Sequence, residues 1–188
     1  MKIEIIEKLY SKKMKNSKDK SIVELYINNE TDLFNKYSIC KKDGIINGNS
    51  KINNDIIEYL INETKMIPNK NRLKICFKII NEINYDSDFV NKMIKNNIFE
   101  KIVIIDKKIK KININSFVFA WIGMIFIGIT QILQFIERRY PLNEFIIVMS
   151  WVFMWKAVDL MFFERAELMK EKGILLKIFF SEIIIQEN

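Results

Sequence analysis

The chain has no histidine, only two cysteines and only two prolines in 188 residues. Histidine is the commonest general base and metal ligand at neutral pH, so its absence excludes Ser-His, Cys-His and His-zinc chemistry within this chain. Cys40 and Cys76 do not form a CxxC motif, and we expect reduced thiols. Because the sequence also has no Gly-rich phosphate loop and no recognisable catalytic carboxylate pair, we assign no catalytic residue, no metal and no cofactor.

Charge is missing from one part of the chain only. The sequence has 30 basic and 23 acidic residues, yet the stretch from Ser116 to Ile136 carries none, and the next twenty or so residues carry very few. Many basic residues border this apolar part. Basic residues at such positions keep the adjoining segment of the chain on the cytoplasmic side of a membrane and contact anionic lipid. The net charge of +7 therefore favours a lipid bilayer as partner and argues against nucleic acid.

The charged part predicts a flexible basic segment over residues 1–20, followed by a cytosolic domain over residues 21–112. The basic start has no apolar stretch and no cleavage site, so we do not expect a signal peptide. A helix lying on the bilayer surface is the alternative for this segment. We expect strands over Ser21 to Ile27, Arg72 to Ile80 and Phe99 to about Ile109. We also expect one helix that Asn54 caps and that ends before Pro68, and a second that Asp86 or Ser87 caps and that ends at about Asn97.

That order of elements predicts a small α/β layer with two helices on one face of a sheet. The apolar part then predicts a first transmembrane helix over residues 116–136, because the twenty uncharged residues that follow Ser116, FVFAWIGMIFIGITQILQFI, span about 30 Å. A turn over residues 137–141 contains Pro141, which prevents one continuous helix. The whole chain is thus predicted to be α+β, with a cytosolic α/β layer followed by a two-helix transmembrane hairpin.

The second transmembrane helix, predicted over residues 142–163, is interrupted by Lys156 and Asp159. Each charge costs about 2.5–3.5 kcal/mol at the middle of the bilayer. Both lie near the charged end of the helix, however, and their i, i+3 spacing allows a mutual ion pair. Two functions stay open for this intramembrane pair: a step in an ion or proton pathway, or a structural pair at the cytoplasmic border.

Basic residues near the helix ends predict the orientation. Lys107, Lys108, Lys110 and Lys111 precede the first helix and Arg165 follows the second, and we expect these five to contact lipid headgroups. The protein should therefore be a multi-pass protein of the inner (plasma) membrane with both termini in the cytoplasm. The remaining residues, 164–188, predict a charged helix and an apolar tail, which is either an interfacial helix or a strand that returns to the sheet.

Small and polar residues recur at steps of three and four along the first helix, which places them on one face. In lipid, such a face packs against another helix. An antiparallel hairpin would bring Ser150 near Gln131, yet one serine cannot satisfy two glutamines, so we expect self-association as well. The predicted packing and self-association face consists of Ala120, Gly123, Thr130, Gln131, Gln134, Ser150 and Ala157.

The end of the second helix, WVFMWKAVDLMFFER from Trp151 to Arg165, resembles a segment of small, uncharacterised two-helix membrane proteins from low-GC bacteria. The resemblance extends back through the IIEYLINETKMIP and RLKICFKI segments and implies an architecture without catalytic residues. An acidic residue is common in that group where Lys156 stands here, which argues against a strict charge relay at this position.

Three classes of function follow from this architecture. The first is a membrane-anchored interaction or effector module, in which the cytosolic domain senses or binds a partner and the hairpin self-associates; by analogy of layout alone, bacterial defence effectors belong here. The second is an accessory subunit of a larger membrane transporter or channel, in which case the partner is a membrane protein. The third is an enzyme that uses Glu58, Glu63, Asp86 or Asp88, and the spacing of these carboxylates does not support it.

Overall fold

The computed structural model describes residues 20–27, 30–34, 41–42, 45–46, 52–68, 71–79, 87–135 and 142–187. It consists of two compact units, Met1–Ile102 with Gly173–Asn188, and Val103–Lys172. The predictions for the segment before Lys20, for Cys40 and for the turn at residues 137–141 lie outside the described residues.

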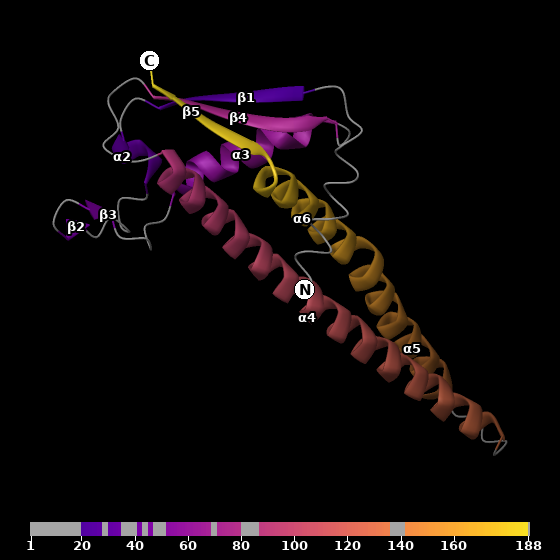
Figure 1. Ribbon diagram of the computed structural model, residues 1–188. Helices are drawn as coiled ribbons and strands as arrows, with labels where there is room; N and C mark the ends of the chain where they lie inside the picture. The colour runs from indigo at the N-terminus through magenta and orange to yellow at the C-terminus, as the bar shows by residue number, and fades with distance from the viewer. Residues whose placement is uncertain are drawn as a thin grey trace. The chain divides into compact units, whose positions relative to one another are not determined.

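The first unit contains a parallel sheet of three strands in the order β1, β4, β5 (Figure 1). The strands are β1 (Lys20–Ile27), β4 (Arg72–Ile79) and β5 (Glu182–Glu187). The strands predicted from Ser21 and from Arg72 are therefore confirmed, and the apolar tail ends as a strand of this sheet. Parallel neighbours need a crossover connection, and here the crossover from β4 to β5 includes both long apolar helices.

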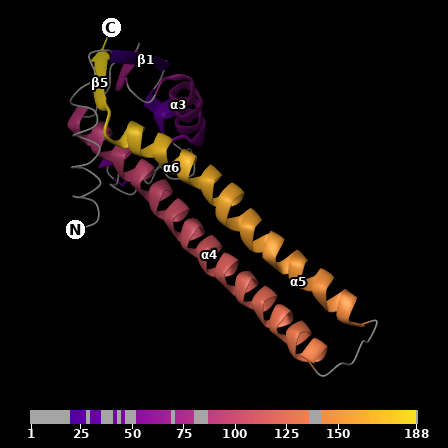
Figure 2. The same cartoon turned by 90° about the vertical axis from the view of Figure 1, so that its right-hand side faces the viewer.

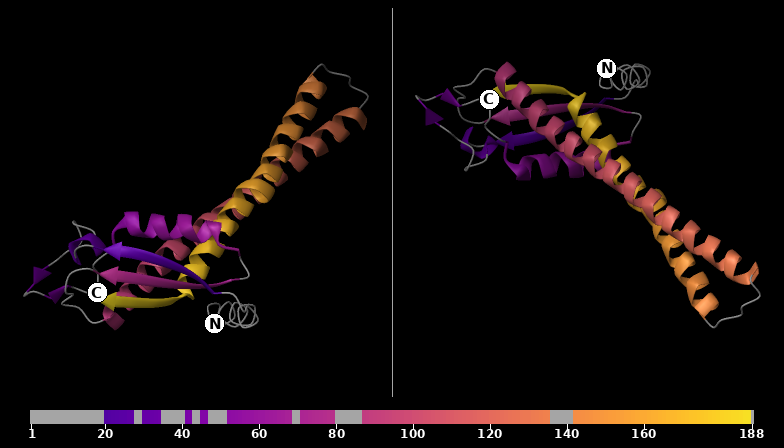
Figure 3. Two further views of the ribbon diagram at one scale, coloured as in Figure 1. Left: turned by 90° about the horizontal axis from the view of Figure 1, so that it is seen from above. Right: turned by 90° about the horizontal axis from the view of Figure 1, so that it is seen from below.

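One face of the sheet forms the core. Val23 pairs with Ile75 and Leu25 with Phe77, and all four side chains are buried. The alternate residue Tyr26 is 65% exposed on the other face. α3, the start of α4 and the end of α6 all lie on the buried face, whereas no described element covers the other one (Figure 3). Alternation with period two along β1 and β4 thus produces a sheet with one covered and one open face.

The helix α3 (Asn54–Met66) begins one residue earlier than its sequence signal indicates. The N-cap is Asn53, whose side-chain oxygen accepts a hydrogen bond of 3.2 Å from the backbone N–H of Asp55, where Asn54 was the predicted cap. Ile57 and Leu60 bury the inner face of this helix. The remaining short elements of this unit are α2 (Glu30–Leu33) and the antiparallel pair β2 (Lys41–Lys42) and β3 (Ile45–Ile46).

The predicted strand from Phe99 to about Ile109 is wrong, because α4 (Ser87–Phe135) is one helix of 49 residues. The β-branched run IVII favours a strand locally. However, no proline or glycine interrupts the chain after Ser87 until Gly123, and the buried residues follow the helical period. These buried residues, at steps of four and three, are Ile94, Ile98, Ile102, Ile105 and Ile109.

The chain returns through α5 (Leu142–Asp159), the π-helix η1 (Leu160–Glu164) and α6 (Arg165–Phe179). The predicted charged helix after residue 164 is present, and it continues through Gly173 to Phe179. Leu175 and Ile178 at the end of α6 are buried in the first unit. Residues far along the chain therefore complete the core of the α/β layer.

Candidate functional site

Two described helices are long and apolar enough to cross a membrane, Ser87–Phe135 and Asn143–Phe179. Only 17% of the most apolar window of each is buried, whereas the core helix of a soluble protein is mostly buried. Large apolar side chains consequently cover the outside of both helices. Those more than half exposed include Phe117, Trp121, Ile125 and Ile132 on α4, Phe145, Trp151 and Trp155 on α5, and Phe162 on η1.

α4 and α5 lie side by side in the second unit (Figure 2). The buried hydroxyl of Ser116 donates a hydrogen bond of 2.8 Å to the main-chain oxygen of Ala157. At Gly123 the helices approach so closely that an added Cβ would lie 2.9 Å from Cγ of Met154 and 3.3 Å from the carbonyl oxygen of Ser150. Small side chains at these positions therefore permit the contact between the two helices.

Aromatic rings fill the space on both sides of this close approach. Phe153 of α5 stacks against Phe119 and Phe126 of α4, with ring centroids 6.1 Å and 5.6 Å apart. Stacked aromatic pairs at these distances contribute about 0.5–1.5 kcal/mol beyond the area they bury. The contact thus combines small residues with a three-ring stack, and the rings were not part of the predicted packing face.

The structure divides the predicted packing and self-association face into two groups. Gly123, Thr130, Ser150 and Ala157 are buried, and Ala120 is half-buried. Gln131 and Gln134 are exposed and form no hydrogen bond with another described side chain. Ser150 lies beside Gly123, about two helical turns from Gln131, and so does not reach either glutamine.

The other hydroxyls of this region are satisfied inside their own helices. Oγ1 of Thr130 donates to the carbonyl oxygen of Ile127 at 2.7 Å, and Oγ of Ser150 donates to that of Ile147 at 2.6 Å. The polar groups between α4 and α5 are therefore paired without the glutamines, which leaves Gln131 and Gln134 as the polar side chains on the outside.

A charged cluster lies at the end of α5. Nζ of Lys156 is 2.8 Å from Oδ2 of Asp159 and 3.1 Å from Oε1 of Glu164, and the three side chains are between 44% and 48% exposed. One ammonium thus bridges two carboxylates on the surface of an apolar helix. Sequence reasoning identified the first two residues by their i, i+3 spacing but missed Glu164.

The π-helix η1 accounts for the contact with Glu164. In an uninterrupted α-helix, eight residues rotate by about 800°, which leaves residue i+8 roughly 80° away around the axis. A π-turn takes one more residue per hydrogen-bonded turn, so it lessens this rotation and brings Glu164 toward the face that carries Lys156. A π-turn has no simple sequence signal, and the spacing alone could not have revealed this pair.

The basic residues predicted at the membrane border are placed differently from one another. Lys107, Lys108, Lys110 and Lys111 are all exposed on α4. Arg165 is half-buried, and its Nε is buried without a hydrogen-bond partner among the described residues. An ion pair between Lys172 and Asp106 joins α6 to α4 within the same unit.

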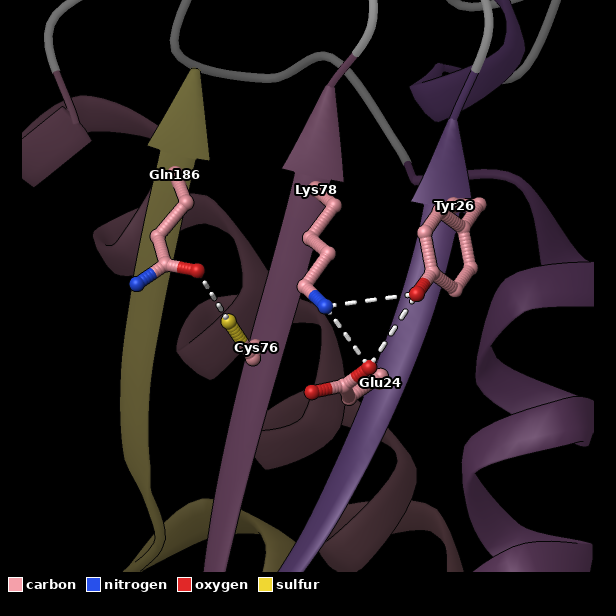
Figure 4. Close-up of polar contacts among 5 residues, drawn as sticks. All are labelled: Glu24, Tyr26, Cys76, Lys78 and Gln186. Carbon is pink, nitrogen blue, oxygen red and sulfur yellow. Dashed lines mark hydrogen bonds and ion pairs between the residues drawn. The ribbon is translucent and has the colours of Figure 1, made fainter. Parts of the chain in front are cut away.

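The open face of the sheet carries a second polar cluster (Figure 4). Nζ of Lys78 lies 2.8 Å from Oε2 of Glu24 and 3.2 Å from the hydroxyl of Tyr26, and Tyr26 donates to Glu24 at 3.2 Å. The hydrogen bond with Glu24 raises the pKa of Lys78 to about 12, and the same bond lowers the pKa of Glu24. Beside it, Sγ of Cys76 lies 3.3 Å from the side-chain oxygen of Gln186.

A buried lysine links two helices of the first unit. Lys177 of α6 is 2% exposed, and its Nζ donates to the carbonyl oxygens of Ile67 and Pro68, at 3.2 Å and 2.9 Å, just beyond the end of α3. A cation at a helix C-terminus is favourable. Burial nevertheless lowers the pKa of Lys177. This residue fixes α3 to α6 and was not among the predicted site residues.

Comparison of the chain with protein-family models, with curated proteins and with solved structures finds no match. The described residues contain no group of three or more histidine, cysteine or acidic side chains placed to hold a metal ion. The candidate site is therefore the apolar helix pair with its charged cluster, together with the open sheet face of the α/β layer.

Proposed function

We propose that this protein is a membrane-anchored interaction module, in which a transmembrane hairpin formed by α4 and α5 carries a cytosolic α/β layer that binds a partner. The observation that supports the membrane most directly is the exposure of large apolar side chains along both helices. Soluble monomers rarely expose contiguous apolar patches larger than a few hundred Å². A bilayer would cover this surface.

The hairpin is favoured by the way the chain enters and leaves the apolar helices. β4 precedes them and β5 follows them, and these two strands are hydrogen-bonded neighbours. This pairing supports a path in which both ends of the apolar segment lie on the same side of a membrane, with an even number of crossings. Six residues separate Phe135 from Leu142, a length that suits a tight connection between antiparallel helices.

The charges next to the apolar part of the chain support a location in the inner (plasma) membrane. They also support an orientation in which the α/β layer and both termini lie in the cytoplasm. Lys107, Lys108, Lys110 and Lys111 precede the apolar part of α4, where they would contact anionic headgroups. Ala157 contacts Ser116, which lies about 7.5 Å along the helix from Lys111. Lys156 is then close to this border, where its long side chain can reach the interface.

The open sheet face is the surface that we propose for the cytosolic partner. Ile22 and Tyr26 are exposed on it, next to the Glu24 and Lys78 pair. Lys74, Glu182 and Gln186 lie on the same face, so it combines charged and polar groups with a few exposed apolar residues. In a transient interface, charges of this kind set orientation.

Cysteine accessibility in intact cells tests the membrane part. Single cysteines at Glu144, which is exposed at the start of α5, and at Asn188 would be placed in a background with Cys40→Ser and Cys76→Ser. An impermeant maleimide should label position 144 but not position 188. Labelling at both positions would reject the hairpin, and release of the protein from membranes by alkaline carbonate would reject the membrane itself.

A further inference from the structure

The outer side of α4 has two faces with different chemistry, and both point away from α5. One face is purely aliphatic and consists of the exposed residues Val118, Ile125, Ile129 and Ile132. The other contains a glycine, a glutamine and aromatic residues at alternating steps of four and three. We call it the Gly128 stripe, and it consists of Phe117, Trp121, Met124, Gly128, Gln131 and Phe135.

Gly128 leaves this stripe open at its centre. A Cβ built on Gly128 meets no atom within 4 Å, whereas one built on Gly123 meets Met154 and Ser150. The two glycines of α4 thus face different surroundings: Gly123 faces α5, and Gly128 faces outward. Without a side chain at Gly128, the backbone of a second helix can approach closely, as at other small-residue helix contacts in lipid.

Gln131 lies one turn from Gly128 on the same stripe. Its amide is exposed within a stretch without charges, and Thr130 and Ser150 already bond within their own helices. A primary amide both donates and accepts hydrogen bonds, so it is complementary to a copy of itself. The stripe has no charge that would call for a charged partner, and its open glycine allows two equal helices to cross.

We propose that the Gly128 stripe is the surface through which two copies of this protein associate, with α4 crossing α4 at Gly128 and Gln131 bonding across the two-fold axis. This inference rests on the proposed membrane hairpin, because two copies inserted the same way present the same face to each other in parallel. Two copies would then associate through the Gly128 stripe, whereas α4 contacts α5 of the same copy through the surface at Gly123. The aliphatic face is left to lipid.

Disulfide cross-linking of purified full-length protein in phosphatidylcholine and phosphatidylglycerol vesicles tests the surface. Single cysteines replace residues one at a time in the background without Cys40 and Cys76, and a copper oxidant forms the bond. We expect dimers at Met124, Gly128 and Gln131, and few at Val118, Ile125 and Ile132. The reverse pattern, or no periodicity, would overturn the proposal.

Two matched pairs of variants test the energetics by energy transfer between labelled copies at a series of dilutions in lipid. Gly128→Ile and Gln131→Leu should each weaken association by roughly tenfold, the scale of one polar or small-residue contact in a bilayer. The matched controls are Val118→Phe, on the aliphatic face, and Gln134→Leu, at a position 60° around the helix from Gln131. Both controls should leave the association between copies unchanged. A Cβ at position 128 meets no atom of its own protomer within 4 Å, so we expect Gly128→Ile to leave the helix pair folded, and the unfolding measurement on the monomer checks this.

The outcomes also separate this inference from the proposed function. Protein that stays in carbonate-washed membranes but remains monomeric at every dilution would overturn the stripe and leave the hairpin intact. Protein that is released by carbonate would reject the hairpin. Because only this chain is present in the vesicles, cross-links between copies cannot come from a different partner.

Discussion

The hydroxyl of Ser116 donates a hydrogen bond of 2.8 Å to the main-chain oxygen of Ala157, which joins α4 to α5 by a buried polar contact. We expect Ser116→Ala to lower the stability of the helix pair by about 0.5–1.5 kcal/mol, the usual net value of one such bond. Thr130→Val is the control, because Thr130 bonds to Ile127 of its own helix. Unfolding by titration with a denaturing detergent measures both, and equal losses would contradict a bond that joins the two helices.

The two glycines of α4 offer a test of close packing. Gly123→Leu should destabilise the helix pair by about 1–3 kcal/mol, because the new side chain must enter the space held by Met154 and the backbone of Ser150. Gly128→Leu is the matched control and should not destabilise the monomer, since its Cβ meets no atom within 4 Å. Both variants are compared at dilutions where the protein is monomeric. A larger loss for Gly128→Leu would mean that the two faces of α4 are assigned the wrong way round.

Lys177 gives a prediction for the α/β layer. Lys177→Met should destabilise it by about 1–3 kcal/mol, because the carbonyl oxygens of Ile67 and Pro68 lose their donor. Lys170→Met, an exposed change on the same helix, should cost less than about 0.5 kcal/mol. Chemical denaturation of the full chain in mild detergent measures both changes.

The titration of Lys177 should make the stability of the α/β layer depend on pH, with a definite sign. Burial lowers the pKa of Lys177 in the folded state below 10.5, its value in the unfolded chain. Between the folded-state pKa and 10.5, the unfolded chain therefore binds more protons than the folded protein. Stability should therefore rise with pH across that window, and the cost of holding the charge should be complete below it. Lys177→Met should abolish this rise; an unchanged slope would assign it to another group.

Several elements of the fold were predictable because their signals are local. The alternation along β1 and β4 and the apolar stripe of α3 each specify one element and one buried face. The strand predicted at Phe99 failed because IVII favours a strand by residue type, while the spacing of the buried isoleucines from Ile94 to Ile109 belongs to a longer helix. The helical period of the buried isoleucines over sixteen residues therefore outweighed the strand preference of four residues.

The candidate site was predictable only in part, because its remaining features depend on contacts between distant residues. Glu164 reaches Lys156 through a π-turn, and Lys177 meets carbonyl oxygens about 110 positions earlier in the chain. The small residues of α4 were correctly placed at helical spacing, but spacing cannot tell which of them face α5. The residues of α4 that face α5 are known only once the register between the two helices is known. The closeness of Gly123 to Met154 and Ser150 gives this register.

On the open sheet face, Glu24 and Lys78 should each shift the pKa of the other. The bond with Glu24 is the largest cause of the raised pKa of Lys78, so Glu24→Gln should move that pKa from about 12 toward 10.5. The stabilisation from Lys78 is complete below pH 10.5 and is lost as the pH rises toward 12. The stabilisation from Glu24 is present above pH 4.5 and is lost as the pH falls through its lowered pKa. Nuclear magnetic resonance of the Lys78 side chain reports the shift, and Tyr26→Phe should change it less.

The charged cluster on α5 predicts an asymmetry between single and double variants. Nζ of Lys156 contacts both Asp159 and Glu164, so Asp159→Asn or Glu164→Gln alone leaves it one carboxylate. The double variant leaves an unpaired ammonium in an apolar helix, at a cost of up to about 2.5–3.5 kcal/mol if it lies at the bilayer centre and less at the border. We therefore expect each single variant to insert normally and the double variant to insert poorly.

Adding Lys156→Leu to the double variant should restore insertion, because the charge that lost its partners is removed. The fraction of α5 that spans the bilayer, measured with glycosylation acceptor sites placed on either side of it in microsomes, reports all four proteins. If the two carboxylates serve an ion or proton pathway and do not support insertion, all four proteins should insert equally while conductance changes. Equal insertion would thus reject the structural role of the cluster, and a change in conductance measured beside it would support a role for Lys156 in transport.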